Sequence, residues 1–307
     1  MNLITSPDNS RRRIAAVGMY DGVHLGHRFL IDYLGVEARS RGLVPSVVTF
    51  MRHPLTVVRP SEAPMLLDNV EDRVIKLSEA GAEDIIMLSF NDSLHHMSAE
   101  KFLSRLKNRY GIQALVIGFN NRLGHDLPST IDQYRTIGSA VGIDVIPAPE
   151  YRGTGAPISS SAIRQYLREG DIAKATEALG GHYMLRGKVV DGKHLGRTLG
   201  FPTANILPSG EDQLIPRHGV YAAWVTTPDG RRRRGVVNIG TRPTVETYPG
   251  AEPSIEVHII DFQGYIYDEE LRVEFVDRLR PERCFPSTDK LVAQIKEDIA
   301  RANKILK

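Results

Sequence analysis

Along the first half of the chain, short apolar runs alternate with segments whose apolar residues recur at helical spacing. Residues 14–17 and 44–50 are apolar, and the segment between them carries Phe29, Leu30 and Leu34 along a helix-like face. Further helices are expected at 70–80, 99–110 and 131–141, and further strands at 84–90, 114–118 and 144–147. Repeated strand–helix–strand units predict a doubly wound parallel α/β sheet, with ligands bound at the carboxyl ends of its strands.

The second half follows a different pattern, in which short alternating segments are separated by turn-forming residues. Two short helices are expected at 161–169 and 172–179, and Gly180 and Gly181 end them. Strands are expected at 183–190, 219–226, 234–239, 254–260 and 271–279, and a final amphipathic helix at 288–302. This pattern predicts a small antiparallel β-barrel with a C-terminal helix. We therefore expect two domains, residues 1–180 and residues 181–307, with the boundary near residue 181.

Composition narrows the class of protein. The length of 307 residues is that of about two domains. Lys and Arg number 39 against 37 Asp and Glu, and this net charge of +2 argues against a general nucleic-acid coat. The single cysteine, Cys284, excludes an internal disulfide and a Cys-rich zinc site. No signal peptide and no apolar run of about 18 residues is apparent, so we expect a cytoplasmic protein with no membrane or nucleic-acid partner.

A basic run, Arg-Arg-Arg-Arg at residues 231–234, follows a Pro-Asp-Gly turn. We interpret this run as the solvated tip of a hairpin. An RNA-binding patch is the alternative.

The segment at residues 18–27, Gly-Met-Tyr-Asp-Gly-Val-His-Leu-Gly-His, joins the first predicted strand to the first helix. A helix N-terminus offers unpaired N–H groups and the positive end of a dipole, so this junction suits a phosphate group. Gly22 and Gly26 allow close approach of a ligand, and His24 and His27, if protonated, would stabilise charge on a phosphate. The alternative is that the histidines cap the helix or are solvated. A metal site is disfavoured because further ligands are not evident.

Far downstream, residues 158–164 read Ile-Ser-Ser-Ser-Ala-Ile-Arg. Serines before a helix supply a cap and spare hydroxyl groups. Arg164, one turn inside the helix, offers a planar guanidinium group to a triphosphate. Serine caps and surface arginines are common, so this segment alone does not establish a site.

Together, GMYDGVHLGH and ISSSAIR resemble the nucleotidylyltransferase superfamily with its His-x-Gly-His motif. More narrowly, they resemble the FAD synthetase half of bacterial bifunctional riboflavin kinase/FAD synthetases. The resemblance implies that the FMN phosphate attacks the α-phosphorus of ATP and that pyrophosphate leaves, without a covalent enzyme intermediate. It implies that His24 and His27 stabilise the reacting phosphates and that Arg164 holds the ATP phosphates. The other implied contacts are Gly18, Met19, Asp21, Ser160 and Ser161 for the nucleotide, and Asn120 for the flavin.

Two segments depart from the pattern of that family. Residues 50–54 read Phe-Met-Arg-His-Pro, where the family usually has Phe-Asp/Glu-Pro-His-Pro. Residues 118–124 lack two aromatic residues that the family has there, and aromatic stacking is typically worth about 0.5–1.5 kcal/mol. These departures keep a second hypothesis open, in which the first domain binds nucleotide but makes little or no FAD.

The barrel half opens on a glycine-rich turn. Gly192, Gly196 and Gly200 recur at four-residue intervals around Lys193 and Arg197. A flexible turn with exposed N–H groups and cations can wrap a polyphosphate. A polar hairpin is the alternative from this segment alone.

Polar side chains follow that turn. Thr203 and Asn205 alternate in an extended segment and offer hard oxygen ligands suited to Mg²⁺. In the strand expected at 254–260, Glu256 and His258 share one face, and a carboxylate there can act as a general base. A cross-strand ion pair is the alternative role for Glu256.

The motifs GKVVDGKHLGRTLGFPTANI, GVYAA, GVVNIGTRPT, IEVHIIDF and LRPE resemble riboflavin kinase in order and spacing, over nearly all of residues 181–303. The resemblance implies that Glu256 activates the 5′-hydroxyl of riboflavin for attack on the γ-phosphate of ATP. It implies that Thr203 and Asn205 contact Mg²⁺ and the ATP phosphates. The other implied contacts are Gly192, Lys193 and Gly200 for ATP, and Asn238, Thr241, Arg280 and Glu282 for the flavin.

We therefore expect a bifunctional enzyme that phosphorylates riboflavin to FMN in the barrel and adenylylates FMN to FAD in the α/β domain. Its expected partners are riboflavin, FMN, FAD and ATP, with Mg²⁺ as cofactor. A riboflavin kinase alone is the second hypothesis. A non-enzymatic flavin or RNA sensor is the third, and the intact Pro-Thr-Ala-Asn motif and Glu256 argue against it.

Overall fold

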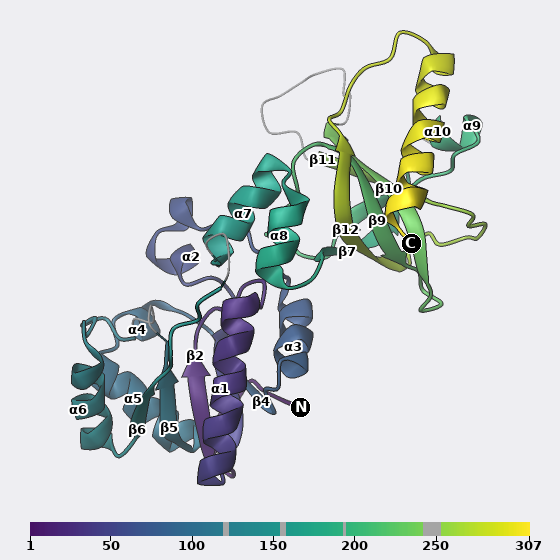
Figure 1. Cartoon of the computed structure of the whole chain (residues 1–307). Coiled ribbons are helices and arrows are strands. Elements are labelled where there is room, and N and C mark those ends of the chain that lie inside the picture. The colour runs from purple at the N-terminus through teal and green to yellow at the C-terminus, as the bar shows by residue number, and fades with distance from the viewer. Residues whose placement is uncertain (119–122, 154–157, 193–194, 242–252) are drawn as a thin grey trace. The chain divides into compact units, whose positions relative to one another are not determined.

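The computed structural model describes residues 1–118, 123–153, 158–192, 195–241 and 253–307 (Figure 1). The chain divides into two compact units, Met1–Leu66 with Val70–Gly155, and Leu67–Asn69 with Ala156–Lys307. The second unit begins before residue 181 because α7 (Ser160–Glu169) and α8 (Ile172–Leu179) pack against the apolar core of the barrel. The expected domain boundary at residue 181 separates two sets of motifs, and it stays a prediction.

The first unit is a parallel sheet in the order β1-β4-β3-β2-β5-β6, which confirms the expected α/β architecture. Its strands are β1 (Asn2–Ile4), β2 (Arg13–Val17), β3 (Val44–Phe50), β4 (Asp84–Leu88), β5 (Ile112–Ile117) and β6 (Asp144–Pro147). Its longer helices are α1 (Leu25–Arg41), α3 (Val70–Glu79), α5 (Ala99–Tyr110) and α6 (Ile131–Val141). The short helices α2 (Leu55–Val58), η1 (Pro60–Glu62) and α4 (Asp92–His95) follow the carboxyl ends of β3 and β4.

Strand order reverses at β2, which lies at the centre of the sheet. From β2 the chain continues to β3 and β4 on one side, and it returns to β5 and β6 on the other. Apolar clusters cover both faces, so the central strands are buried throughout, as continuous apolar runs predict. The carboxyl ends of β2 and β5 are therefore the place where a doubly wound sheet binds ligands.

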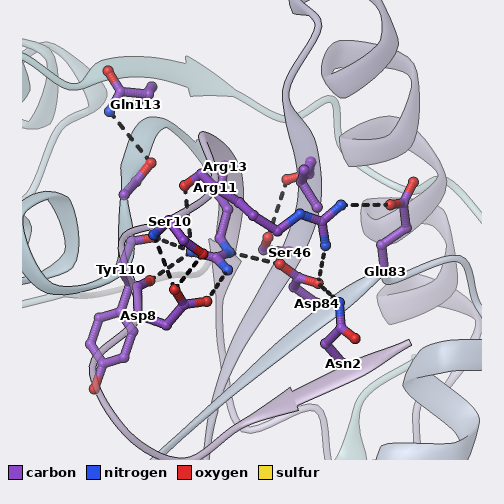
Figure 2. Close-up of polar contacts among 12 residues, drawn as sticks. Asn2, Asp8, Ser10, Arg11, Arg13, Ser46, Glu83, Asp84, Tyr110 and Gln113 are labelled. Atoms are coloured by element: carbon purple, nitrogen blue, oxygen red, sulfur yellow. Dashed lines mark hydrogen bonds and ion pairs between the residues drawn. The ribbon is translucent and has the colours of Figure 1, made fainter.

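A buried ion-pair network lies at the opposite edge of the sheet and joins the amino ends of β1, β2 and β4 (Figure 2). Arg13 Nε donates to Asp84 Oδ2 (2.7 Å), and neither side chain is exposed. Asn2 Nδ2 and Arg11 Nη1 donate to the other oxygen of Asp84 at 2.8 and 2.7 Å. Arg13 Nη2 also meets Asp8 Oδ2 at 2.6 Å. The network therefore links the beginnings of β1, β2 and β4.

The second unit is an antiparallel barrel, as the sequence predicts, and it is closed in the order β10-β11-β8-β7-β12-β9. Its strands are β7 (Tyr183–Val190), β8 (Ala204–Pro208), β9 (Gly219–Thr226), β10 (Arg232–Thr241), β11 (Pro253–Ile259) and β12 (Glu270–Arg280). The sequence did not identify β8 as a strand, because it is short and only partly apolar. A one-turn helix, α9 (Leu195–Thr198), precedes β8, and α10 (Thr288–Ile305) packs on the outside of β9, β10 and β12.

Asp84→Asn should destabilise the first unit by about 3–5 kcal/mol, because the buried guanidinium of Arg13 loses its fully buried carboxylate partner. Denaturant unfolding followed by circular dichroism measures this loss. Glu62→Gln, which breaks the exposed pair of Arg59 and Glu62 (3.3 Å), is the control and should cost less than about 1 kcal/mol. Equal losses for the two variants would contradict the role of the network.

Candidate active sites

The loop between β2 and α1 has a strained backbone. Tyr20 and Val23 have φ values of 54° and 38°, a region that residues with a Cβ rarely adopt. The side chain of Tyr20 is buried, and a Cβ on Gly18 would lie 3.1 Å from its ring. Gly18 therefore makes room for Tyr20. Strain of this kind concentrates at ligand sites, so the loop is a candidate ligand site.

His24 and His27 lie together at the N-terminus of α1. His24 is the N-cap residue, and the backbone N–H of His27 donates to its Nδ1 (3.3 Å). The two rings stack at 3.6 Å between centroids, and Tyr20 meets His27 edge-on at 5.1 Å. Because Nδ1 of His24 accepts a hydrogen bond, the proton of the neutral ring is on Nε2. His24 therefore caps the helix through Nδ1. Its Nε2–H remains able to donate a hydrogen bond to another group.

Both histidines are neutral in the free protein. Burial lowers the pKa of His24 to about 4. Burial, together with the neighbouring His24, holds the pKa of His27 well below its ordinary value. Each neutral ring carries one N–H group that can donate a hydrogen bond, and the sequence had left the protonation of the two histidines open.

Of the other nucleotide residues expected in this loop, Met19 is held by contacts from the neighbouring strand and helix. Thr49 Oγ1, near the end of β3, donates to the carbonyl oxygen of Met19 (3.1 Å). The buried Arg73 of α3 lies 3.6 Å from Met19 Sδ and donates to the carbonyl oxygen of Phe50 (2.6 Å). Asp21 is buried. Sequence reasoning missed Arg73, because an arginine in an amphipathic helix gives no sign of being buried.

A cavity of about 370 Å³ lies at the carboxyl ends of β2, β3, β4 and β5. Its walls are mainly apolar, and they include Val17, Met19, Phe50, Pro54, Phe90, Leu94, Met97, Phe102, Leu123 and Leu127. Phe50 and Phe90 meet at right angles with centroids 5.5 Å apart. His95 and His125 also line the cavity, and their rings lie edge to face at 5.5 Å. Sequence reasoning missed Phe90, His95 and His125, and the expected flavin contact Asn120 lies outside the described residues.

The Ser-Ser-Ser segment caps α7, as expected. Ser159 is the N-cap residue, and its Oγ accepts from the backbone N–H of Ala162 (3.1 Å). Ser160 and Ser161 begin the helix, and Arg164 Nη2 lies 3.4 Å from Ser161 Oγ. These residues belong to the second compact unit, whereas His24 belongs to the first. Their contacts with ATP phosphates remain predictions from the resemblance.

Backbone register brings three expected residues of the barrel into one row. Glu256 on β11 lies directly opposite Asn205 on β8 and Asn238 on β10. Directly opposite side chains point to the same face, with Cβ atoms about 5 Å apart. All three side chains are half-buried. We call Asn205, Glu256 and Asn238 the polar row, in which one carboxylate stands between two amides.

Three glycines lie directly against side chains that are expected to bind Mg²⁺, ATP or flavin. A Cβ on Gly192 would overlap the side-chain amide of Asn205, and a Cβ on Gly196 would lie 3.2 Å from Thr203 Oγ1. A Cβ on Gly240 would overlap the carboxylate of Glu282. These polar groups therefore lie against bare backbone. The periodic glycines of the sequence make room for side chains, and Gly200, with φ of 85°, forms a left-handed turn.

A cavity of about 540 Å³ adjoins the start of β8. Thr203 and Arg197 line it, and its other walls come from Val189, Pro202, Ala204, Val257, Ile259 and residues 262–267. Tyr265 and Tyr267 lie in that segment with ring centroids 5.2 Å apart. His258 lies two residues beyond Glu256 on the same strand face, and its Nδ1 donates to the carbonyl oxygen of Pro202 (2.9 Å). This bond fixes the Pro-Thr-Ala-Asn segment to β11.

Two expected flavin residues near the C-terminus have structural partners. Arg280 forms a salt bridge with Asp298 of α10, at 2.9 Å between Nη2 and Oδ2. Its guanidinium also lies over the ring of Phe285, 5.6 Å from the centroid. Glu282 lies against Gly240. Arg280 therefore ties α10 to β12, and its contact with flavin stays a prediction. Lys193 and the side chain of Thr241 lie outside the described structure.

The basic run belongs to the hairpin between β9 and β10, but only Arg231 precedes the strand, whereas the other three arginines begin β10. Each arginine meets a carboxylate: Arg231 and Arg233 meet Asp229 (3.7 and 2.7 Å), Arg232 meets Glu274 (2.5 Å), and Arg234 meets Asp261 (3.5 Å). This pairing opposes the RNA-binding alternative.

Within the described ranges, no helix has the length and apolar character needed to cross a membrane. The same residues contain no group of three or more His, Cys, Asp or Glu side chains placed to hold a metal ion.

The fold and these two sites define a class of protein in which a nucleotide-binding α/β unit is joined to a phosphotransferase barrel. Residues 6–162 match the FAD synthetase family, and residues 179–306 match the riboflavin kinase family. The chain belongs to the family of bifunctional riboflavin kinases/FMN adenylyltransferases. This confirms the resemblance and the two-step synthesis of FMN and FAD expected from the sequence.

Similar proteins span nearly the whole chain. The bifunctional riboflavin kinase/FMN adenylyltransferase of Escherichia coli (strain K12) is 34% identical over 93% of this chain and 90% of its own length. The Haemophilus influenzae protein of the same name is 33% identical over 98% of both chains. A crystal structure described as a macrolide-efflux protein from Streptococcus pneumoniae has a TM-score of 0.87 and 28% identity, over 98% of both chains.

Proposed function

We propose that the barrel transfers the γ-phosphate of ATP to the 5′-hydroxyl of riboflavin, with Glu256 as the general base. The polar row is the observation that carries this proposal, because it holds one carboxylate between two amides, and two of its strands, β8 and β11, also line the 540 Å³ cavity. Glu256 takes the hydroxyl proton as the oxygen attacks the γ-phosphorus. ADP leaves with the electron pair of the broken P–O bond. Asn205 and Asn238 position the reacting groups, and positioning supplies much of the catalysis in phosphoryl transfer.

Thr203 and Asn205 are the residues that would hold Mg²⁺ with ATP. Their donors fit, because hydroxyl and amide oxygens are hard ligands and the side chains lie against Gly196 and Gly192, where bare backbone leaves room. When bound, the ion neutralises charge on the ATP phosphates. The cavity lined by Thr203 and Arg197 has the size and the apolar walls suited to the adenosine group.

We also propose that the first unit transfers AMP from ATP to FMN. An oxygen of the FMN phosphate attacks the α-phosphorus, and pyrophosphate leaves with the electron pair of the broken bond. The N–H groups at the start of α1 and the neutral rings of His24 and His27 donate to the phosphates. Their strained loop is fixed before ATP binds, so little reorganisation is needed.

We assign the 370 Å³ cavity to the isoalloxazine ring of FMN. Its walls are apolar and aromatic, which suits a flat ring system and not a phosphate group. Phe50 and Phe90 supply two aromatic walls, and His95 and His125 supply two further rings. These histidines provide aromatic surface in a chain whose residues 118–124 lack two of the family's aromatic side chains. The cavity therefore favours full FAD synthesis over a kinase acting alone.

Glu256→Gln should lower FMN formation from riboflavin at least about 100-fold, because the general base is lost. FAD formation from added FMN should be unchanged, because it uses the other unit. Flavins are separated by chromatography after reaction with Mg²⁺ and ATP. Glu274→Gln, which removes a carboxylate that pairs with Arg232 on the same barrel, is the control and should leave both reactions intact. A folded Glu256→Gln variant that loses both activities would contradict separate sites.

His95→Ala and His125→Ala should each raise the KM for FMN in adenylylation about 2- to 10-fold and leave the KM for ATP unchanged. Initial rates at varied FMN and varied ATP separate these constants. His96→Ala is the matched control, because His96 contacts His95 (4.7 Å between centroids) but does not line the cavity. If the His96 variant behaves like the other two, or if the KM for ATP rises instead, the cavity does not hold the flavin.

A further inference from the structure

Arginine side chains surround a third cavity, of about 380 Å³, in the second unit. The cavity is lined by Arg168, Ile215, Pro216, Arg217 and His218. Arg278 of β12 adjoins it, because Arg278 Nη2 donates to the carbonyl oxygen of His218 (2.6 Å). We call Arg168, Arg217 and Arg278 the cationic cluster. It shares no residue with the polar row or with the cavity lined by Thr203.

The three arginines of the cluster form no salt bridge with any carboxylate among the described residues. By contrast, five arginines of the barrel strands each lie within 3.5 Å of a carboxylate, namely Arg186, Arg232, Arg233, Arg234 and Arg280. Two acidic residues near the cluster in sequence have other partners: Glu169 accepts from Gln165 Nε2, and Asp171 pairs with Lys174. Asp277 accepts from the backbone N–H of Arg278, and in the described structure no salt bridge joins it to the guanidinium groups of the cluster.

The carbonyl groups at the C-terminus of α7 offset only part of the positive charge of the cationic cluster. Arg217 Nη1 donates to the carbonyl oxygen of Glu169 (3.3 Å), and Arg278 passes between Gly170 and Gly219, where a Cβ would come within 2.8 Å of its side chain. A helix C-terminus carries the equivalent of about half a negative charge, against three guanidinium groups that remain protonated. The excess positive charge around a concave surface favours a bound anion.

We propose that the cationic cluster binds a phosphate-bearing anion of about the size of pyrophosphate, at a site separate from the proposed phosphotransfer site of the barrel. Guanidinium groups match phosphate oxygens in a two-pronged geometry. Pyrophosphate is released by the adenylyl transfer, and nucleotides carry the same chemical group. Binding at this cluster depends on neither proposed activity, so its failure would leave both of them standing.

Isothermal titration calorimetry of the full-length protein tests this proposal, with pyrophosphate in one arm and AMP in the other. The double variant Arg168→Gln/Arg217→Gln should lose one binding site per chain, or bind there at least about tenfold more weakly, because two charge-assisted contacts are removed. Arg231→Gln/Arg234→Gln removes the same charge from exposed barrel arginines and is the control, which should bind as the wild type does. Both variants should retain FMN and FAD formation, which shows that they are folded.

The two arms identify the source of the phosphate. A site lost only in the pyrophosphate arm supports the free anion, and a site lost only in the AMP arm supports a nucleotide phosphate. If the isotherms of Arg168→Gln/Arg217→Gln match those of the wild type in both arms, or if the control variant loses binding equally, the proposal is wrong.

Discussion

Closure of the barrel fixes the register on which the phosphotransfer site depends. Each strand in the order β10-β11-β8-β7-β12-β9 has neighbours on both sides, so no strand has a free edge along which to slip. A slip of one residue would turn Glu256 into the apolar interior, which Ile255 and Val257 now fill. It would also separate Glu256 from Asn205 and Asn238. The apolar interior of the barrel therefore places the polar row on the opposite face.

The two ends of the α/β sheet have different tasks. At the amino end, the buried pair of Arg13 and Asp84 holds β2 and β4 together across the sheet. At the carboxyl end, the backbone of Tyr20 and Val23 is strained, and the buried histidine pair is kept neutral. The strained backbone and the buried histidines both lower the stability of the folded protein, so they persist only where the surrounding structure is rigid. The ion-pair network contributes to that rigidity.

Apolar periodicity predicts most of this fold, because burial decides where strands and helices form. It misses β1 and β8, which are short and only partly apolar. Motif spacing identifies Glu256 and Asn205, but only strand pairing shows that they are neighbours. The 370 Å³ cavity was beyond sequence reasoning, because Phe90 and His125 follow different strands and meet through the order of the sheet. The partner of Arg280 was hidden for a similar reason, since it lies on a separate helix.

The central claim is that one chain carries out two successive reactions at separate sites. The most direct test incubates the purified protein with Mg²⁺ and ATP, adding riboflavin in one reaction and FMN in another, and then resolves the flavins by chromatography. The account predicts FMN followed by FAD from riboflavin, and FAD directly from FMN. FMN without FAD in both reactions, or no FMN from riboflavin, would contradict it.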